Sequence, residues 1–428
     1  MIFCKKAGWG MALLFLCLIF GTGRTQKIEA AVQNVPESLE EESRLDTVGT
    51  DQETERAAVR EKKGQQEKEA GDTETDQAAA AQDELLAELD FDAIQQEVDS
   101  LLSSQQFSFA GTVRSLLQDG DPFRTFRAGN AVLSCAKTAF LAQKGLMKEL
   151  FLLVLAGAVL GSFSSLFEGK QVRDASFYMV YLLALALILK NFQSSGENLK
   201  AVITSLVAFM RILTPSYYLA AAAAGGASSA VMFYQMLLLV ILAVEKLLLA
   251  LVLPMIHIYL LIALVNDLSG EEILSHMTEL LETCVNGLLK SSLGVLVGMQ
   301  MIRNLIAPAL DSLRQMALWR TAGMIPGIGN AVNAVTELVA GSAVLIRNCF
   351  GVTAMLVLLA AGIVPAVQLL VSGLSFRLLA AAAQPVSDKR IAGCLAAAGK
   401  GYAMLLRLLL TVEVLFLLTI AILAGTFS

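Results

Sequence analysis

Long apolar segments, which recur from residue 150 to the C-terminus, constrain the fold of this chain more than any other feature. Each of them is long enough to cross the ~30 Å hydrocarbon core of a bilayer as an α-helix. None alternates strictly between polar and apolar residues, as a membrane barrel strand would. The whole chain is 56% hydrophobic and only 16% charged, which excludes an ordinary soluble domain. We therefore predict an all-α, polytopic helical membrane protein. The clear span candidates are 150–167, 175–192, 229–265, 288–306, 351–373 and 402–425.

Two further apolar stretches, 201–225 and 324–346, are less regular. The first contains Pro215 and a run of alanines. The second opens with residues that favour a turn, namely Pro326, Gly327 and Gly329. Non-helical backbone at membrane depth is tolerated only where protein or a water-filled cavity satisfies its polar groups. We therefore expect broken or re-entrant helices in both stretches, and between six and eight spans in total.

The prolines suggest a weak internal repeat. Pro215 and Pro326 are each followed, 39 positions later, by a second proline inside a strongly apolar segment, Pro254 and Pro365. Paired interruptions of this kind in two halves of a chain are typical of transporters with inverted repeats. The alternative is that proline recurs by chance in apolar helices.

Two loops follow these proline pairs at matching positions and differ in charge. The loop at 269–273 is acidic, whereas the loop at 387–391 is basic. The excess of Lys and Arg in cytoplasmic loops would place the two loops on opposite sides of the membrane. If the repeat is real, its halves are therefore expected to be inverted.

Several ionisable residues lie inside or beside apolar segments, among them Glu245, Lys246 and Glu413. An ionisable group at bilayer depth is costly and usually faces protein or water, so each is a candidate functional residue. For Glu245 and Lys246 the alternative is a turn at the membrane interface. For Glu413 we expect a role in polar packing or in lining a pore. Two GxxxG pairs predict close helix packing rather than chemistry, namely Gly157 with Gly161 and Gly294 with Gly298.

Three segments precede the membrane domain at 147–428. Residues 1–31 match a secretory signal peptide, although an uncleaved signal anchor is the alternative and the cleavage site stays open. Residues 32–82 are acidic and almost free of large apolar side chains, which predicts a disordered tether. Residues 83–146 are amphipathic, which predicts extracytoplasmic helices that pack on a partner, lie at lipid headgroups or pack on themselves. The arm is expected outside the cell, and residues 168–174 are expected inside because they carry Lys170 and Arg173.

Sequence motifs for catalysis are absent from the chain. It has six cysteines without a CxxC pair, two histidines without a metal-ligand spacing, no GxxxxGK[ST] loop and no GxSxG elbow. We therefore expect no enzyme activity, no metal and no cofactor, and any energy source must be another subunit.

Three stretches together resemble the stage III sporulation protein AE family of endospore-forming Firmicutes. The first begins the amphipathic region with Leu89-Asp90-Phe91-Asp92-Ala93-Ile94. The second is Met324-Ile325-Pro326-Gly327-Ile328-Gly329-Asn330-Ala331-Val332. The third is Gln384-Pro385-Val386-Ser387-Asp388-Lys389-Arg390-Ile391. The resemblance covers about residues 83–428 and leaves out the acidic tether.

The resemblance implies a multi-pass protein of the mother-cell membrane that surrounds the forespore. It also implies partners: the other stage III A-operon proteins, including a secretion-type ATPase, and indirectly stage II sporulation protein Q of the forespore. The resemblance further implies that this protein is the permease or conduit of a feeding-tube channel that sustains late forespore gene expression. The alternative is a structural platform that anchors ring-forming partners without transport of its own. A conduit would be lined by Pro215, Pro326, Gly327, Gly329, Asn330 and Asn333.

Overall fold

The computed structural model describes residues 90–102, 107–119, 128–164, 170–223, 228–269, 274–322, 329–385 and 387–425. The chain divides into two compact units, Met1–Glu88 and Leu89–Ser428, and all described residues belong to the second. The predicted signal peptide and acidic tether lie outside the described residues. So do Pro326 and Gly327.

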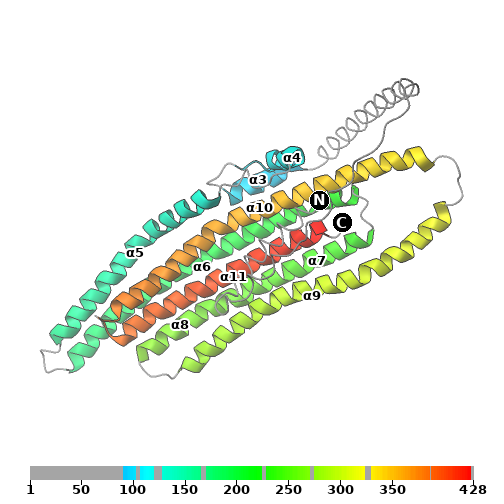
Figure 1. The fold of residues 1–428 in the computed structure, drawn as a ribbon. Helices are drawn as coiled ribbons and strands as arrows, with labels where there is room; N and C mark the ends of the chain where they lie inside the picture. Colours follow the sequence, from blue (N-terminus) through cyan, green and yellow to red (C-terminus); the bar gives the residue numbers. More distant parts are fainter. Residues whose placement is uncertain are drawn as a thin grey trace, which may run out of the picture. The chain divides into compact units, whose positions relative to one another are not determined.

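Long helical rods make up the described part of the second unit, which contains no strand (Figure 1). One rod is composite, because α7 (Ser228–Leu247) continues through a π-helical turn, η1 (Leu248–Val252), into α8 (Leu253–Ser269). The other long helices are α5 (Ala128–Ser164), α6 (Lys170–Ala223), α9 (Ser275–Ala322), α10 (Gly329–Ala383) and α11 (Lys389–Gly425). Two short helices precede them, α3 (Phe91–Leu101) and α4 (Phe109–Asp119).

Five helical segments of the described residues are long and apolar enough to cross a membrane, which makes the chain a multi-pass membrane protein. They are Phe177–Tyr217, Leu238–Ser269, Ser275–Met299, Gly341–Ala383 and Lys389–Ala421. The predicted span at 150–167 belongs to α5, which is not among the five, and its side chains are described only as far as Val159.

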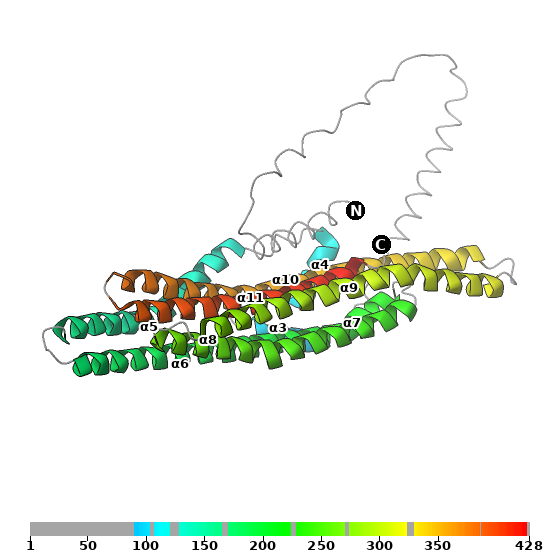
Figure 2. The same ribbon diagram turned by 90° about the horizontal axis from the view of Figure 1, so that it is seen from below.

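The long helices form three antiparallel hairpins, α5 with α6, α8 with α9 and α10 with α11 (Figures 1 and 2). Figure 1 shows the helix ends beside the three hairpin connections at one end of the bundle, which we call the turn end. Arg390 at the start of α11 joins three helices there. Its Nη1 donates to the carbonyl of Leu268 on α8 at 3.4 Å, and its guanidinium lies 5.4 Å from the ring centroid of Phe177 on α6.

The prediction that the acidic and basic loops lie on opposite sides is therefore wrong. The helix ends beside 269–273 and 387–391 meet at the turn end, as the Arg390 contact shows. The physical reason is connectivity, because two long helices, α9 and α10, separate the loops and the chain reverses direction twice. An inverted repeat with these loops as its matching ends does not fit this fold.

Prolines do not break the helices of the bundle. α6 runs without interruption through Pro215, so the break predicted at that residue is wrong. A proline removes one intrahelical hydrogen bond, and the surrounding packing of α6 compensates, since Leu213 and Tyr217 are buried. α10 likewise continues through Pro365. Pro254 follows the π-helical turn η1, whose wider hydrogen-bonding pattern accommodates the missing N–H.

The continuity of the helix also excludes one of the two interpretations of Glu245 and Lys246. Both lie near the end of α7, which passes directly into η1 and α8, so the interpretation as an interfacial turn is wrong. The GxxxG pairs also differ. A Cβ at Gly157 would lie 2.9 Å from Val180 of α6, which confirms close packing there, whereas Gly294 and Gly298 have nothing within 4 Å.

The amphipathic helices α3 and α4 pack on the long helices rather than standing alone. Phe109 lies against Phe350 of α10 with ring centroids 4.9 Å apart, and Phe91 contacts the same ring at 6.0 Å. Gln95 on α3 joins the two short helices, because its amide donates to the carbonyl of Phe107 and accepts from the N–H of Phe109. The start of the predicted membrane domain at 147 falls inside α5.

Candidate functional site in the membrane-spanning bundle

One face of α6 is polar over the length of a membrane crossing. We call it the α6 polar face, and it consists of the exposed residues Lys190, Gln193, Ser194, Glu197, Asn198, Lys200, Thr204 and Arg211. They recur at steps of three and four, which places them along one stripe of a helix. From Lys190 to Arg211 the stripe is about 32 Å long at 1.5 Å per residue. No large apolar side chain of α6 is exposed between Lys190 and Pro215.

The neighbouring helices present a different surface at the same depth. Two contacts set that depth, because Asn191 meets Tyr402 of α11 and Tyr217 lies against Phe350 of α10, with ring centroids 6.3 Å apart. α10 therefore runs beside the α6 polar face with its apolar segment. Most large exposed side chains on the other spanning helices are apolar there, among them Leu251, Ile258, Leu261, Leu370 and Leu374, while Gln368 of α10 and Arg407 of α11 are single exposed polar residues among them.

This asymmetry separates two environments around the bundle. Exposed leucines and isoleucines suit lipid tails, whereas two lysines, an arginine and a glutamate suit water or a polar protein surface. Within the span candidate Phe177–Tyr217 the α6 polar face is therefore the side that suits a polar environment. Within it, Gln193 Nε2 donates to Glu197 Oε1 at 3.1 Å, and the four charged residues leave a net charge of about +2 at neutral pH.

A hydrogen-bonded cluster lies directly behind the α6 polar face. Asn191 Nδ2 donates to the hydroxyl of Tyr402 at 2.6 Å, and Ser195 Oγ lies 3.2 Å from the same hydroxyl. Ser195 also donates to the carbonyl of Asn191 at 3.0 Å. The ring of Tyr402 stacks on Phe376 of α10 with centroids 5.3 Å apart. The cluster thus fixes α6, α10 and α11 to one another at the depth of the polar face.

His257 of α8 completes the packing beside this cluster. Its Nδ1 lies 2.9 Å from the carbonyl of Leu253, which can only accept, so Nδ1 carries the hydrogen. Its ring contacts Phe192 edge-on and lies so close to Gly196 that a Cβ there would be 2.6 Å from Nε2. His257 is therefore a packed residue held by its own helix.

Glu413 is the predicted site residue that the structure buries most deeply. It is 3% exposed, and neither carboxyl oxygen has a hydrogen-bond partner among the described residues. Its carboxyl lies against Gly362 of α10, where any Cβ would collide with it. Glu245 is half-buried and Lys246 is exposed, both near the end of α7.

Of the other predicted conduit residues, those that the structure describes lie apart from Glu413 along the helices. Pro215 is exposed on α6 at the end of the polar face. Gly329, Asn330 and Asn333 lie in the first turns of α10, where the structure describes the backbone only. Their role in a pore stays a prediction.

The α6 polar face was not predicted, although its signal is present in the sequence. Lys190, Ser194, Glu197, Thr204 and Arg211 recur at helical spacing from the end of the first apolar stretch into the second. The predicted segments end at 192 and begin again at 201, so the prediction contains no continuous helix through the polar residues between them.

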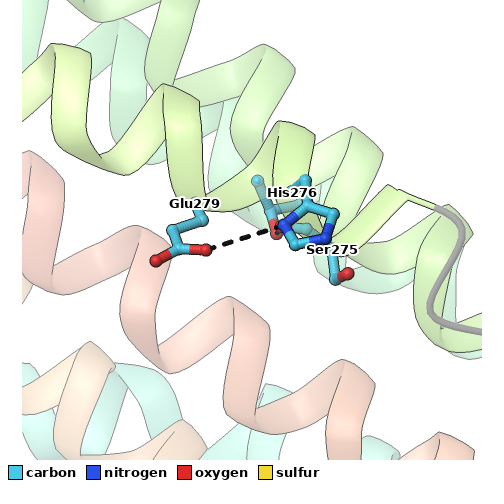
Figure 3. A network of polar contacts seen from close by, with 4 residues as sticks. Ser275, His276 and Glu279 are labelled. Carbon is cyan, nitrogen blue, oxygen red and sulfur yellow. Dashed lines mark hydrogen bonds and ion pairs between the residues drawn. The ribbon is translucent and has the colours of Figure 1, made fainter.

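Other polar contacts in the described residues do not form a site. His276 Nδ1 lies 4.0 Å from Glu279 Oε2 near the start of α9, with both side chains almost fully exposed, so this pair contributes little (Figure 3). Among the described residues no group of three His, Cys, Asp or Glu is arranged to hold a metal ion.

Comparisons with known proteins point to one family. The family model for stage III sporulation protein AE matches residues 107–426. Stage III sporulation protein AE of Bacillus subtilis (strain 168) is 22% identical over 291 residues, which cover 67% of this chain and 73% of that protein. No solved structure matches the chain.

Proposed function

Because the chain belongs to the stage III sporulation protein AE family, we propose that this sporulation membrane protein is the permease or conduit part of a channel between mother cell and forespore. In this proposal it resides in the mother-cell membrane around the forespore. It works there with the other stage III A-operon proteins, including a secretion-type ATPase, and indirectly with stage II sporulation protein Q. The proposal involves no catalysis by this chain.

The observation that supports a conduit is the α6 polar face. A stripe of about 32 Å matches the ~30 Å hydrocarbon core, so water beside it would reach from one side of the membrane to the other. Rings of charged side chains select the ions and small solutes that pass through a pore. A net positive stripe favours small anionic or polar solutes over cations.

A cysteine scan tests whether the α6 polar face meets water. In a variant in which all six native cysteines are replaced by serine, single cysteines are placed at Ser194, Glu197, Ala201 and Thr204. A water-soluble, membrane-impermeant thiol reagent should modify them in liposomes. Matched cysteines at the exposed apolar positions Leu251, Ile258 and Leu370 should stay unmodified.

A flux measurement then tests conduction. Liposomes that contain the purified protein should release a small anionic dye faster than empty liposomes, and modification at Glu197 or Thr204 should slow the release. Water-accessible cysteines without any flux would contradict a conduit formed by this chain alone. Unmodified cysteines together with normal flux would place the path elsewhere.

The second candidate is a structural platform, and the docking of α3 and α4 supports it. Their contacts with Phe350 of α10 hold an amphipathic pair at a fixed place on the bundle, where partners can bind. One variant distinguishes the two candidate functions. Replacing both Glu197 and Lys200 by leucine should change dye release if the chain conducts, and should leave late forespore gene expression intact if the chain only anchors partners.

A further inference from the structure

The interface between α10 and α11 contains a carboxyl group without a counter-charge. Glu413 lies in the spanning segment Lys389–Ala421 and is 3% exposed. Its two oxygens have no hydrogen-bond partner among the described residues, and no Lys, Arg or His of these residues forms an ion pair with it. Arg407, the preceding charged residue on α11, is exposed and donates instead to Asn286 of α9 at 3.0 Å. An ionised carboxylate in such surroundings would be an unpaired buried charge, which is very costly.

The carboxyl group rests on backbone rather than in an open space. Gly362 of α10 leaves the room that the carboxyl occupies, because a Cβ at this position would overlap with it. Gly362 is itself buried, as are the neighbours of Glu413 on α11, Val412 and Leu415. A metal cation needs several oxygen ligands at short distances. The contact with Gly362 does not supply them, and no group of three His, Cys, Asp or Glu among the described residues is arranged to do so.

A hydrogen-bond acceptor without its usual donor lies next to this contact. In an α-helix the N–H of residue 365 donates to the carbonyl of residue 361, but residue 365 of α10 is proline. The carbonyl of Ala361, a buried residue adjacent to Gly362, thereby lacks its intrahelical donor. A protonated carboxyl carries one O–H donor, which is the group that this carbonyl lacks.

We propose that Glu413 is a proton-binding site within the membrane, held as a neutral carboxylic acid between α10 and α11, whose proton exchanges with water. Binding of the proton converts the carboxylate to the acid. The acid O–H then donates to the backbone carbonyl of Ala361 on α10. Loss of the proton leaves a negative charge between two helices that pack closely. The site thus links proton uptake and release to the packing of α10 against α11.

Infrared spectroscopy of the purified full-length protein in detergent tests the protonation. The difference spectrum between wild type and Glu413→Gln at neutral pH should contain the C=O stretching band of a carboxylic acid. The control, Glu149→Gln, replaces an exposed glutamate of α5 and should give carboxylate bands instead. Carboxylate bands for Glu413 as well would overturn the proposal.

Exchange into D₂O tests whether the proton reaches water. The carboxylic acid band of wild type should move to lower frequency after transfer, whereas a band that stays in place would show a sealed group and contradict the proposal. Gln at 413 keeps the size of Glu and its neutral form, so this variant should unfold at a temperature close to that of wild type. If Glu413→Gln folds poorly, wild type is compared with Gly362→Ala instead. Alanine at 362 should displace the carboxyl and shift or abolish the carboxylic acid band. These spectroscopic measurements do not require transport. They can therefore contradict the proton-binding site without contradicting the proposed conduit, and the flux measurement can contradict the conduit without contradicting the proton-binding site.

Discussion

Asn191 on α6 donates a 2.6 Å hydrogen bond to the hydroxyl of Tyr402 on α11, 211 residues further along the chain. This bond fixes the rotation of α6, because Asn191 points inward while Lys190 and Gln193 point outward. The orientation of the α6 polar face therefore depends on a polar contact in the core of the bundle.

Removal of the Tyr402 hydroxyl should destabilise the bundle. Tyr402→Phe keeps the ring that stacks on Phe376 but leaves the amide of Asn191 without its acceptor. A buried donor without a partner costs about 1–3 kcal/mol. Thermal unfolding in detergent should show a lower midpoint, whereas Tyr178→Phe, at an exposed ring, should not change it. An unchanged midpoint for Tyr402→Phe would mean that water replaces the hydroxyl.

The two glycine pairs should respond differently to a larger side chain. Gly157→Leu places atoms against Val180, and overpacking of this kind costs about 1–3 kcal/mol. A Cβ at Gly294 meets nothing within 4 Å, and leucine there improves helix propensity by up to about 1 kcal/mol. The unfolding midpoints of the two variants should therefore move in opposite directions. A matching loss in Gly294→Leu would reveal a contact of α9 with another subunit.

Truncation of the aromatic contact should release α3 and α4. Phe350→Ala removes the ring that both Phe91 and Phe109 contact, and a change of this type in a core costs about 3–5 kcal/mol. Amide hydrogen exchange in Phe91–Leu101 should become faster, while exchange in α11 stays slow. Phe151→Ala, at an exposed position of α5, serves as the control and should leave both rates unchanged.

Topology can be read from cysteine labelling in intact cells. The signal sequence and the Lys170/Arg173 pair predict that a cysteine at Thr50 reacts with an impermeant reagent and that one at Gly169 does not. The common turn end extends this prediction, since Gln384 should behave as Gly169 does. Labelling of Gly169 from outside would reverse the orientation.

The stretch at Pro326–Gly329 stays a candidate for the conduit. Replacing Gly327 and Gly329 by valine should abolish late forespore gene expression at normal protein levels if the stretch lines the path, because valine restricts the backbone and narrows the space. A strongly reduced protein level would instead indicate a packing role. Full activity at normal levels would leave an ordinary connection between α9 and α10.

Hydropathy predicted the fold class but not the helix boundaries. Apolar residues in runs of spanning length require a helical membrane protein, and this is confirmed. Whether Pro215 breaks its helix could not be predicted from the neighbouring sequence, because one lost hydrogen bond breaks a helix only when packing fails to compensate. The relative position of the loops at 269–273 and 387–391 depends on how many helices lie between them, which loop charge does not report. The contact of Glu413 with Gly362 joins residues of two helices, and only the register of α10 against α11 reveals it.

The lengths of α9 and α10 have a mechanical consequence. With 48 and 55 residues they measure about 72 and 82 Å, more than twice the ~30 Å core of a bilayer. Figure 1 shows their joined ends lying beyond the ends of α7 and α11. An unbroken helix is stiff, so a rotation applied at the Gly329 end of α10 turns the same rod at Gly362 and in the spanning segment. A protein that binds these helix ends outside the bilayer could thereby change the packing of α10 inside the membrane.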